Sequence, residues 1–192
     1  VDHGLGYFIE GKPIAWKLFN GKKSPLKVSY KIENETLSFE LKGPYTSSDT
    51  IVIDPSLTFS TFTGSLADNW GFTATYDLLG NFYAGGIVFS AGFPTTNGAF
   101  RQNYSGGVNE GSITGFDMGI LKFEPGGTSL IYATYVGGNG NEQPHSLVAD
   151  AAGNLVIAGR TSSGNAYPTV NTFPLYGDGG GTFDIILTKL NS

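Results

Sequence analysis

The chain has 192 residues, of which 40% are hydrophobic and only 14% charged, and its formal net charge is −5 at pH 7. This balance excludes the basic surface by which proteins bind nucleic acid, and no apolar run approaches the roughly 18 residues of a membrane-spanning helix. The absence of cysteine excludes disulfides, zinc–thiolate sites and cysteine nucleophiles. The 29 glycines and the 14% aromatic content favour a turn-rich all-β protein, because glycine is costly inside helices and aromatic residues prefer strands.

The first 55 residues are expected to form a small antiparallel β module. Hydrophobic and polar residues alternate, as in strands that bury one face, along residues 14–19, 27–33 and 37–42. Asn20-Gly21, between the first two of these runs, is a strong hairpin signal. A fourth short strand is expected at residues 50–53. Asp54-Pro55 then ends the module, because proline cannot continue a central strand.

Two stretches of the remaining chain carry the same hairpin. Residues 73–88 read TATYDLLGNFYAGGIV and residues 146–161 read SLVADAAGNLVIAGRT, so that Asp77 matches Asp150, 73 positions later. Each copy has two apolar, β-prone runs around a D-x-x-G-N turn, where Gly or Asn adopts the positive φ of a tight reversal. Asp77 and Asp150 are therefore interpreted as residues that fix the adjacent turn. A fixed long period of this kind indicates a repeat architecture.

The flanking segments repeat as well. Residues 57–64 (LTFSTFTG) return as residues 130–137 (LIYATYVG), and residues 115–123 return as residues 182–190. Each repeat thus carries four short strands, in the second copy at residues 130–136, 146–150, 154–160 and 183–190. Tandem four-strand units are typical of propeller blades. Residues 56–192 are therefore expected to form two four-stranded β-propeller blades of a partial propeller. The second blade lacks its last strand, and further blades are expected to follow.

These motifs resemble the SBBP β-propeller repeats of bacterial secreted and cell-surface proteins, especially those of Bacteroidota. The pattern of that family runs roughly YSTYLGG, then a strand ending D-x-x-GN-x-Y-V-x-G-x-T, then FPTT-x-G-A-F, then a Gly-rich loop and D-x-F-V-x-K-L-N. The matching stretches of this chain are residues 132–138, 150–161, 93–100 and 183–191. Residues 10–55 also resemble the end of the β module that precedes such repeats.

The resemblance implies a role outside the cell. Proteins of this family are often exported by the type IX secretion system and are tied to surface adhesion or gliding motility. The expected location is therefore extracellular or on the cell surface. The family pattern contains no catalytic residue to carry over to this chain, and it implies no cofactor.

The strand order predicts different loops at the two ends of each blade, because connectors alternate between ends in an up-and-down sheet. The short-turn end, as it is named here, has the turns at residues 78–79, 124–129 and 151–152. The long-loop end has the connections at residues 65–70, 89–115, 138–145 and 162–181. Long loops on a rigid scaffold are where binding usually resides. A ligand is therefore expected at the long-loop end.

Six polar or aromatic residues of these long loops are the candidate ligand-binding residues: Asp68, Asn69, Trp70, Asn141, Glu142 and His145. Asp178, in the last loop, is a further polar candidate. Trp70 is interpreted as an aromatic wedge between blades or, as the less favoured alternative, as a platform for a sugar ring. His145 is interpreted as a partly buried structural histidine.

No metal site and no catalytic site are expected. Residues 177–184, together with Asn139, Asn141 and Glu142, have oxygen ligands for calcium, but they lack the EF-hand spacing, and Gly-rich loops of this kind are normally turns. The only other histidine, His3, lies in the N-terminal module, which argues against a histidine metal cluster. There is no nucleophile elbow and no arrangement that suggests a catalytic triad.

The sequence therefore predicts a non-catalytic segment of a large secreted or cell-surface bacterial protein, acting as a scaffold, in adhesion or in ligand presentation. Its expected partners are other domains or blades of the same protein and a surface glycan or protein ligand. The alternative is a carbohydrate-binding propeller, or less favoured a carbohydrate-cleaving one, that uses the long-loop end.

Overall fold

The computed structural model describes residues 12–34, 36–54, 59–170 and 181–192. The chain divides into two compact units, unit 1 (Val1–Thr58) and unit 2 (Phe59–Ser192), so the boundary follows Thr58 where the sequence suggested Pro55. The described elements are antiparallel strands and one short 3-10 helix, η1 (Gly164–Ala166), and the predicted all-β fold class is confirmed. None of the described residues belongs to a helix long and apolar enough to cross a membrane.

Unit 1 is one antiparallel sheet with the order β3-β2-β1-β4. Its strands are β1 (Ile14–Phe19), β2 (Lys22–Glu33), β3 (Thr36–Lys42) and β4 (Thr50–Asp54). The predicted hairpin between β1 and β2 is confirmed. Asn20 and Gly21 have φ values of 48° and 74°, the left-handed conformation that both central residues of a type I′ turn adopt. The chain then forms β3 and returns to pair β4 with the other edge of β1.

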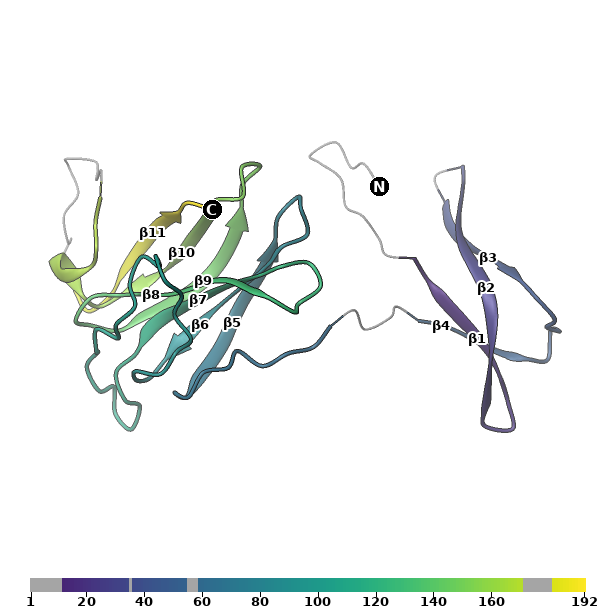
Figure 1. The fold of residues 1–192 in the computed structure, drawn as a ribbon, viewed down its shortest axis with the longest axis horizontal. Coiled ribbons are helices and arrows are strands. Elements are labelled where there is room, and N and C mark those ends of the chain that lie inside the picture. The colour runs from purple at the N-terminus through teal and green to yellow at the C-terminus, as the bar shows by residue number, and fades with distance from the viewer. Residues whose placement is uncertain (1–11, 35, 55–58, 171–180) are drawn as a thin grey trace. The chain divides into compact units, whose positions relative to one another are not determined.

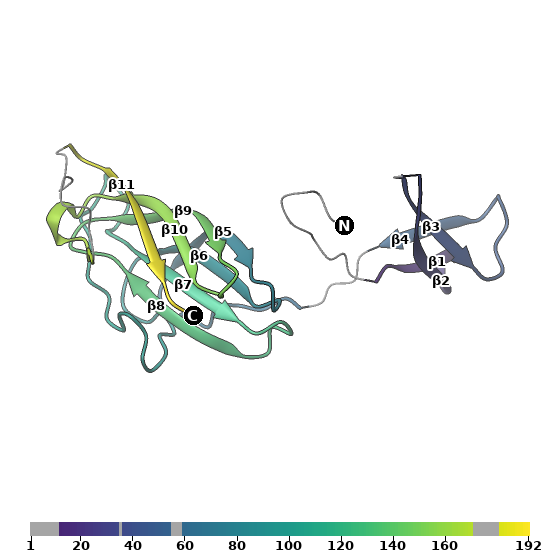
Figure 2. The same ribbon diagram turned by 90° about the horizontal axis from the view of Figure 1, so that it is seen from above.

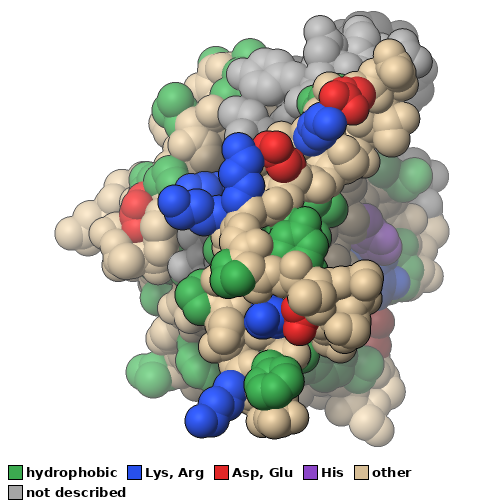
Figure 3. All heavy atoms as spheres, turned by 90° about the vertical axis from the view of Figure 1, so that its right-hand side faces the viewer, with side chains coloured by type: hydrophobic (Ala, Val, Ile, Leu, Met, Phe, Trp, Pro, Cys, Tyr) green, Lys and Arg blue, Asp and Glu red, His purple; other side chains and the backbone are tan. Residues whose placement is uncertain are grey.

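The core of unit 1 is small. Ala15, Leu26 and Val28 are buried, and partly buried side chains of β3 and β4 pack against them. The far ends of β2 and β3 are less covered, since Ile32 is 66% exposed and Leu37 53%. Basic, acidic and hydrophobic side chains are interspersed on the face of this unit that Figure 3 shows.

Unit 2 contains two sheets that match the two predicted blades (Figures 1 and 2). The first blade has the order β5-β6-β7-β8, with β5 (Asn69–Tyr76), β6 (Phe82–Val88), β7 (Asp117–Phe123) and β8 (Leu130–Val136). The second blade has the order β11-β10-β9, with β9 (Glu142–Ala149), β10 (Leu155–Thr161) and β11 (Asp184–Leu190). The blades pack face to face, with β9 lying against β5, β6 and β7.

The main core lies between the two blades. The first blade contributes the fully buried side chains of Tyr83, Met118 and Ile120, and the second contributes those of Leu155 and Ile157. These residues alternate along their strands with residues of the opposite face, as the period of two requires. A second cluster, which includes Phe93 and Tyr135, lies on the other face of the first blade.

The sequence repeat and the sheets are out of phase by one strand. The segment that opens the second repeat is β8, and β8 pairs with β7 of the first blade. The matching segment of the first repeat was expected to be a strand, but residues 59–64 form none. The reason is that, within the described residues, no equivalent of β7 precedes this segment and pairs with it. Phe62 in its centre is 96% exposed.

A β-bulge recurs at the start of both blades. The register between β5 and β6 shifts between Gly71 and Thr73, and that between β9 and β10 shifts at Ala158/Gly159. Gly86 lies opposite the first bulge, where an added Cβ would stand 2.1 Å from the carbonyl oxygen of Trp70. Only glycine leaves room for so close an approach of two backbones.

The bulges lengthen the first strand of each blade toward the long-loop end. Asn69, Trp70, Glu142 and His145 were expected in loops, and the structure corrects this, because β5 begins at Asn69 and β9 at Glu142. The ladder continues past the bulge because the glycine of the opposite strand tolerates it.

Candidate functional site

The described parts of the long loops of unit 2 gather at one end of the blades, as predicted (Figures 1 and 2). The loop at residues 89–116 begins beside β5, where Phe89 N donates a hydrogen bond to Asp68 O at 3.1 Å. It then follows the outer edge of β8, where Tyr135 N donates to Arg101 O at 3.0 Å. The loop thus covers an edge that would otherwise present free backbone groups.

The side chain of Asn141 forms hydrogen bonds with three residues of the loop at residues 89–116. Its Oδ1 accepts a hydrogen bond from Phe116 N at 3.0 Å, and its Nδ2 donates to Val108 O and to Glu110 Oε1, both at 2.8 Å. The side chain is completely buried. The predicted ligand-binding residue Asn141 therefore anchors the loop at residues 89–116 to the start of β9.

Glu142 is also completely buried. Its Oε1 accepts hydrogen bonds from the hydroxyls of Thr161 and Ser163, both at 2.5 Å, and its Oε2 accepts one from Gly138 N at 3.1 Å. These bonds fasten the end of β10 and the turn after β8 to one carboxylate. The second predicted polar candidate thus has its hydrogen bonds inside the fold.

A second buried carboxylate, that of Asp117, lies beside Glu142. A Cβ built on Gly137 would stand 2.5 Å from Asp117 Oδ1 and 2.6 Å from Glu142 Oε2, so both carboxylates face this glycine. Asp117 Oδ2 accepts a hydrogen bond from Ser105 N at 2.6 Å, whereas Oδ1 has no partner in the part of the chain that is described. Burial, together with the nearby charge of Glu142, raises the pKa of Asp117 to about 7, although the Ser105 bond acts against the shift.

Trp70 lies at an apolar hollow on the face of the first blade that points away from the second blade. The hollow has a volume of about 410 Å³ and is floored by small residues of three adjacent strands, among them Ala74, Ala84 and Gly119. Trp70 is 53% exposed, and its ring meets that of Phe89 edge to face at 4.9 Å. Asn69 also lines the hollow. This surface can bind an apolar group or the flat face of a sugar ring.

The remaining candidates are dispersed. Asp68 is exposed beside the hollow, and its backbone oxygen holds Phe89. His145 is exposed, which corrects the expectation of a partly buried histidine. It is the extra residue of the second bulge, between Pro144 and Ser146, and so lacks a cross-strand neighbour. Asp178 lies outside the described residues. Among the described residues no three His, Asp or Glu side chains form a group suited to a metal ion.

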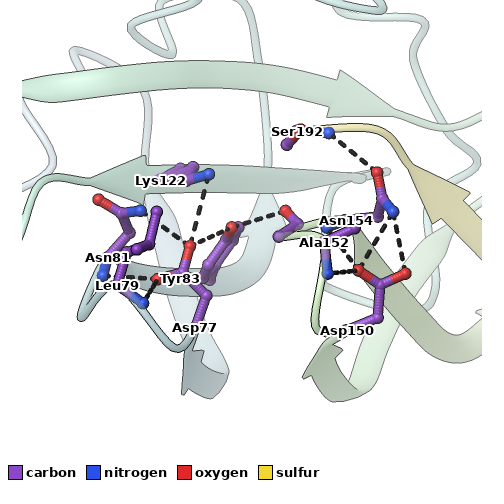
Figure 4. A network of polar contacts seen from close by, with 10 residues as sticks. Asp77, Leu79, Asn81, Tyr83, Lys122, Asp150, Ala152, Asn154 and Ser192 are labelled. Carbon is purple, nitrogen blue, oxygen red and sulfur yellow. Dashed lines mark hydrogen bonds and ion pairs between the residues drawn. The ribbon is translucent and has the colours of Figure 1, made fainter.

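The short-turn end has a second polar network, shown in Figure 4. Asp77 Oδ1 accepts hydrogen bonds from Leu79 N at 3.0 Å and Asn81 N at 2.9 Å, and Oδ2 accepts one from Asn81 Nδ2 at 2.8 Å. Asp150 holds its own turn in the same way through Ala152 and Asn154. The turn-fixing role expected for both aspartates is confirmed.

Tyr83 connects these two turns and was not singled out from the sequence. Its hydroxyl lies 3.0 Å from Asp77 Oδ2 and 2.9 Å from the carbonyl oxygen of Gly153 in the second blade. Lys122 lies 3.6 Å from Asp77 Oδ2. The sequence contained a signal for the lysine. Lys122 and Lys189 occupy matching positions in the repeated segments at residues 115–123 and 182–190, so each repeat has one aspartate and one lysine of this kind.

Comparison with known proteins identifies one domain. Residues 1–56 match a family described as a domain of unknown function, DUF7948. The match covers well under half of the chain and coincides with unit 1. No curated protein matches the chain.

Proposed function

We propose that this chain is a non-catalytic scaffold segment of a large secreted or cell-surface bacterial protein, with repeats of the SBBP type. In this proposal the blades hold the long-loop end in a fixed form for adhesion or ligand presentation. The chain's partners are then other domains or blades of the same protein and a surface glycan or protein.

The observation that supports this proposal is that the polar candidate side chains form their hydrogen bonds with groups of the fold itself. Asn141 and Glu142, the most deeply placed candidates at the long-loop end, are buried and bonded to backbone and hydroxyl groups of the fold. Asp77 and Asp150 at the other end are engaged in their turns. Groups that hold loops in place suit a rigid support better than a reacting centre, which needs access to substrate.

Surface labelling tests the location. An antibody raised against the purified chain should label intact cells of the producing organism, and a protease added outside should remove the signal. Labelling that appears only after the cells are broken would contradict the proposal.

The hollow beside Trp70 favours one alternative, a carbohydrate-binding propeller. An exposed aromatic ring next to an apolar surface is suited to stacking on a sugar. A glycan array with the purified chain separates the two functions. The scaffold proposal expects no glycan binding that depends on Trp70. Specific binding that Trp70→Ala abolishes and Tyr76→Ala preserves would favour the alternative, since Tyr76 is an exposed aromatic residue at the other end of the same strand.

A further inference from the structure

Two buried carboxylates lie together at the long-loop end. Asp117 is the first residue of β7 in the first blade, and Glu142 is the first residue of β9 in the second. Both are 0% exposed, and among the described residues no Lys, Arg or His side chain forms an ion pair with either of them. A buried charge is costly unless a countercharge or a metal ion accompanies it. This pair therefore requires a proton or a cation.

The hydrogen bonds of the pair leave one oxygen of Asp117 without a partner. Glu142 accepts three hydrogen bonds, whereas Asp117 accepts one, from Ser105 N to Oδ2. Asp117 Oδ1 is buried and has no hydrogen-bond partner in the described part of the chain. The half-buried guanidinium of Arg101 donates to the Ser105 hydroxyl and leaves Oδ1 free. Asp117 Oδ1 is thus available to a ligand.

This oxygen and one oxygen of Glu142 are directed to the same place. Asp117 Oδ1 and Glu142 Oε2 both lie within 2.6 Å of the point where a Cβ of Gly137 would stand. Calcium binds oxygen at about 2.3–2.6 Å, so one ion can bridge two oxygens that lie up to about 5 Å apart. Glu142 Oε2 accepts a bond from Gly138 N, and its second lone pair remains for a metal ion.

The other repeat shows that the start of this strand does not need a carboxylate. Asp117 has a counterpart, Asp184, 67 positions later, but Glu142 corresponds to Asn69, 73 positions earlier. Asn69 begins β5 with an uncharged side chain, whose Nδ2 donates to Ala67 O at 2.9 Å. An amide is therefore sufficient to fasten the beginning of such a strand. The negative charge of Glu142 is additional, and it lies beside the second carboxylate.

We propose that Asp117 Oδ1 and Glu142 Oε2 hold one calcium ion between the two blades. Two carboxylates balance the charge of a divalent cation, and oxygen is the ligand that calcium prefers. Calcium accepts irregular sets of about six to eight oxygens, so backbone carbonyl groups and water complete its coordination. Magnesium demands a nearly ideal octahedron. Carboxylates that are already bonded to Ser105 and Thr161 cannot readily adjust to it.

The ion would fasten three parts of unit 2. Asp117 belongs to the first blade and Glu142 to the second, and Ser105 N joins the loop at residues 89–116 to the Asp117 carboxylate. Residues 104–107 of this loop are half-buried, so a local opening of the loop admits the ion. This structural role is the same whether the long-loop end serves as a scaffold or binds a glycan.

Calorimetric titration with calcium chloride tests the site. The purified chain is freed of metal with a chelator, which is then removed, and is titrated at pH 8, where protons compete little for Asp117. One ion per chain should bind. Asp117→Asn and Glu142→Gln each remove one charge with little change of shape, and each should weaken binding by about tenfold or more. Glu33→Gln removes an exposed carboxylate of unit 1 and should bind like the parent chain.

Three results of the titration overturn the proposal. The first is a parent chain that binds no calcium at millimolar concentration. The second is an Asp117→Asn variant with undiminished affinity, which places the ion elsewhere. The third is magnesium chloride that binds as tightly as calcium chloride, which indicates loosely held hydrated ions at the surface.

Urea denaturation with calcium and with chelator gives an independent test. An ion that binds only the folded chain stabilises it, so calcium should raise the urea midpoint of the parent chain at pH 8. The midpoint of Asp117→Asn should not change. This variant is expected to fold, because the amide oxygen can still accept the bond from Ser105 N. Circular dichroism checks the fold. An equal rise in the parent chain and in Asp117→Asn overturns the proposal.

Discussion

The two blades of unit 2 carry the same turn in different surroundings. In the first, the Asp77 and Lys122 side chains are 3% and 7% exposed, because the second blade covers them. In the second, the equivalent Asp150 and Lys189 are 32% and 57% exposed. The turn bonds of the two aspartates are nearly identical. The comparison teaches that the contribution of a repeated residue depends on whether another blade lies over it.

Replacing Asp77 is expected to give the largest difference in stability between the two blades. Asp77→Ala removes the acceptor of three turn hydrogen bonds and leaves the buried Lys122 without its countercharge. We expect the free energy of unfolding to fall by about 3–5 kcal/mol, measured by urea denaturation. Asp150→Ala is the matched control and should lose clearly less, because Lys189 is free to turn to solvent. Equal losses would contradict the role assigned to the covering blade.

The buried carboxylate of Asp117 gives the next effect. Its pKa is raised from 3.8 to about 7, so the folded state holds a proton that the unfolded state has already released. The favourable contribution of this proton is complete below about pH 4 and is lost as the pH rises to about 7. We expect this group to lower the free energy of unfolding by a few kcal/mol across that range.

Asp117→Asn tests this pH dependence, because an amide cannot ionise. The variant should flatten the fall in stability between about pH 4 and pH 8 and be more stable than the parent chain at the upper end. Asp68→Asn, at an exposed position, should leave the profile unchanged. A parent chain whose stability increases steadily over this range, with the same profile in Asp117→Asn, would contradict the assignment.

The tyrosine hydroxyl between the blades gives a smaller effect. Tyr83→Phe removes the hydroxyl that lies between Asp77 Oδ2 and Gly153 O, and it should cost about 1–2 kcal/mol of unfolding free energy. Tyr132 is an internal control, because its ring lies 6.4 Å from that of Tyr83 and its buried hydroxyl has no partner among the described residues. Tyr132→Phe should be neutral or stabilising. If both variants lose the same stability, packing and not hydrogen bonding is responsible.

The smallest effect is expected at the exposed pair of the second blade. Lys189 Nζ lies 2.7 Å from Asp150 Oδ2, but solvent reaches both groups. Lys189→Ala should change the stability little, and the change should disappear at high salt, since exposed ion pairs are screened. Denaturation at low and high salt measures this. A large, salt-independent loss would show that the second blade is covered in solution.

The turns and the strand pattern were predictable because they depend on local chemistry. The D-x-x-G-N turns and the Asn20-Gly21 hairpin need particular backbone conformations, and few residue types supply them. The candidate site was harder to predict from the sequence. Asn141 and Glu142 look like loop polar residues in the sequence, and nothing local shows that Phe116 and Ser163 fold back on them.

The strand expected at residues 57–64 does not form over the described residues 59–64, for a related reason. Its sequence is as strand-like as that of β8, but a strand needs a partner, and β8 finds one in β7. The extension of β5 and β9 beyond their expected starts depends on bulges, which Gly86 and Gly159 permit from the opposite strand. These distant relations are tertiary and leave no periodic signal in the chain.

The pairing of β8 with β7 also bears on how such an array changes its length. A 73-residue unit that starts at the repeat boundary contains the closing strand of one sheet, followed by the opening strands of the next sheet. Recombination that duplicates or deletes such a unit regenerates the same β7–β8 pairing at each junction. Whole repeats can therefore be gained or lost without altering the interior of any blade, and each blade remains tied to its successor during unfolding.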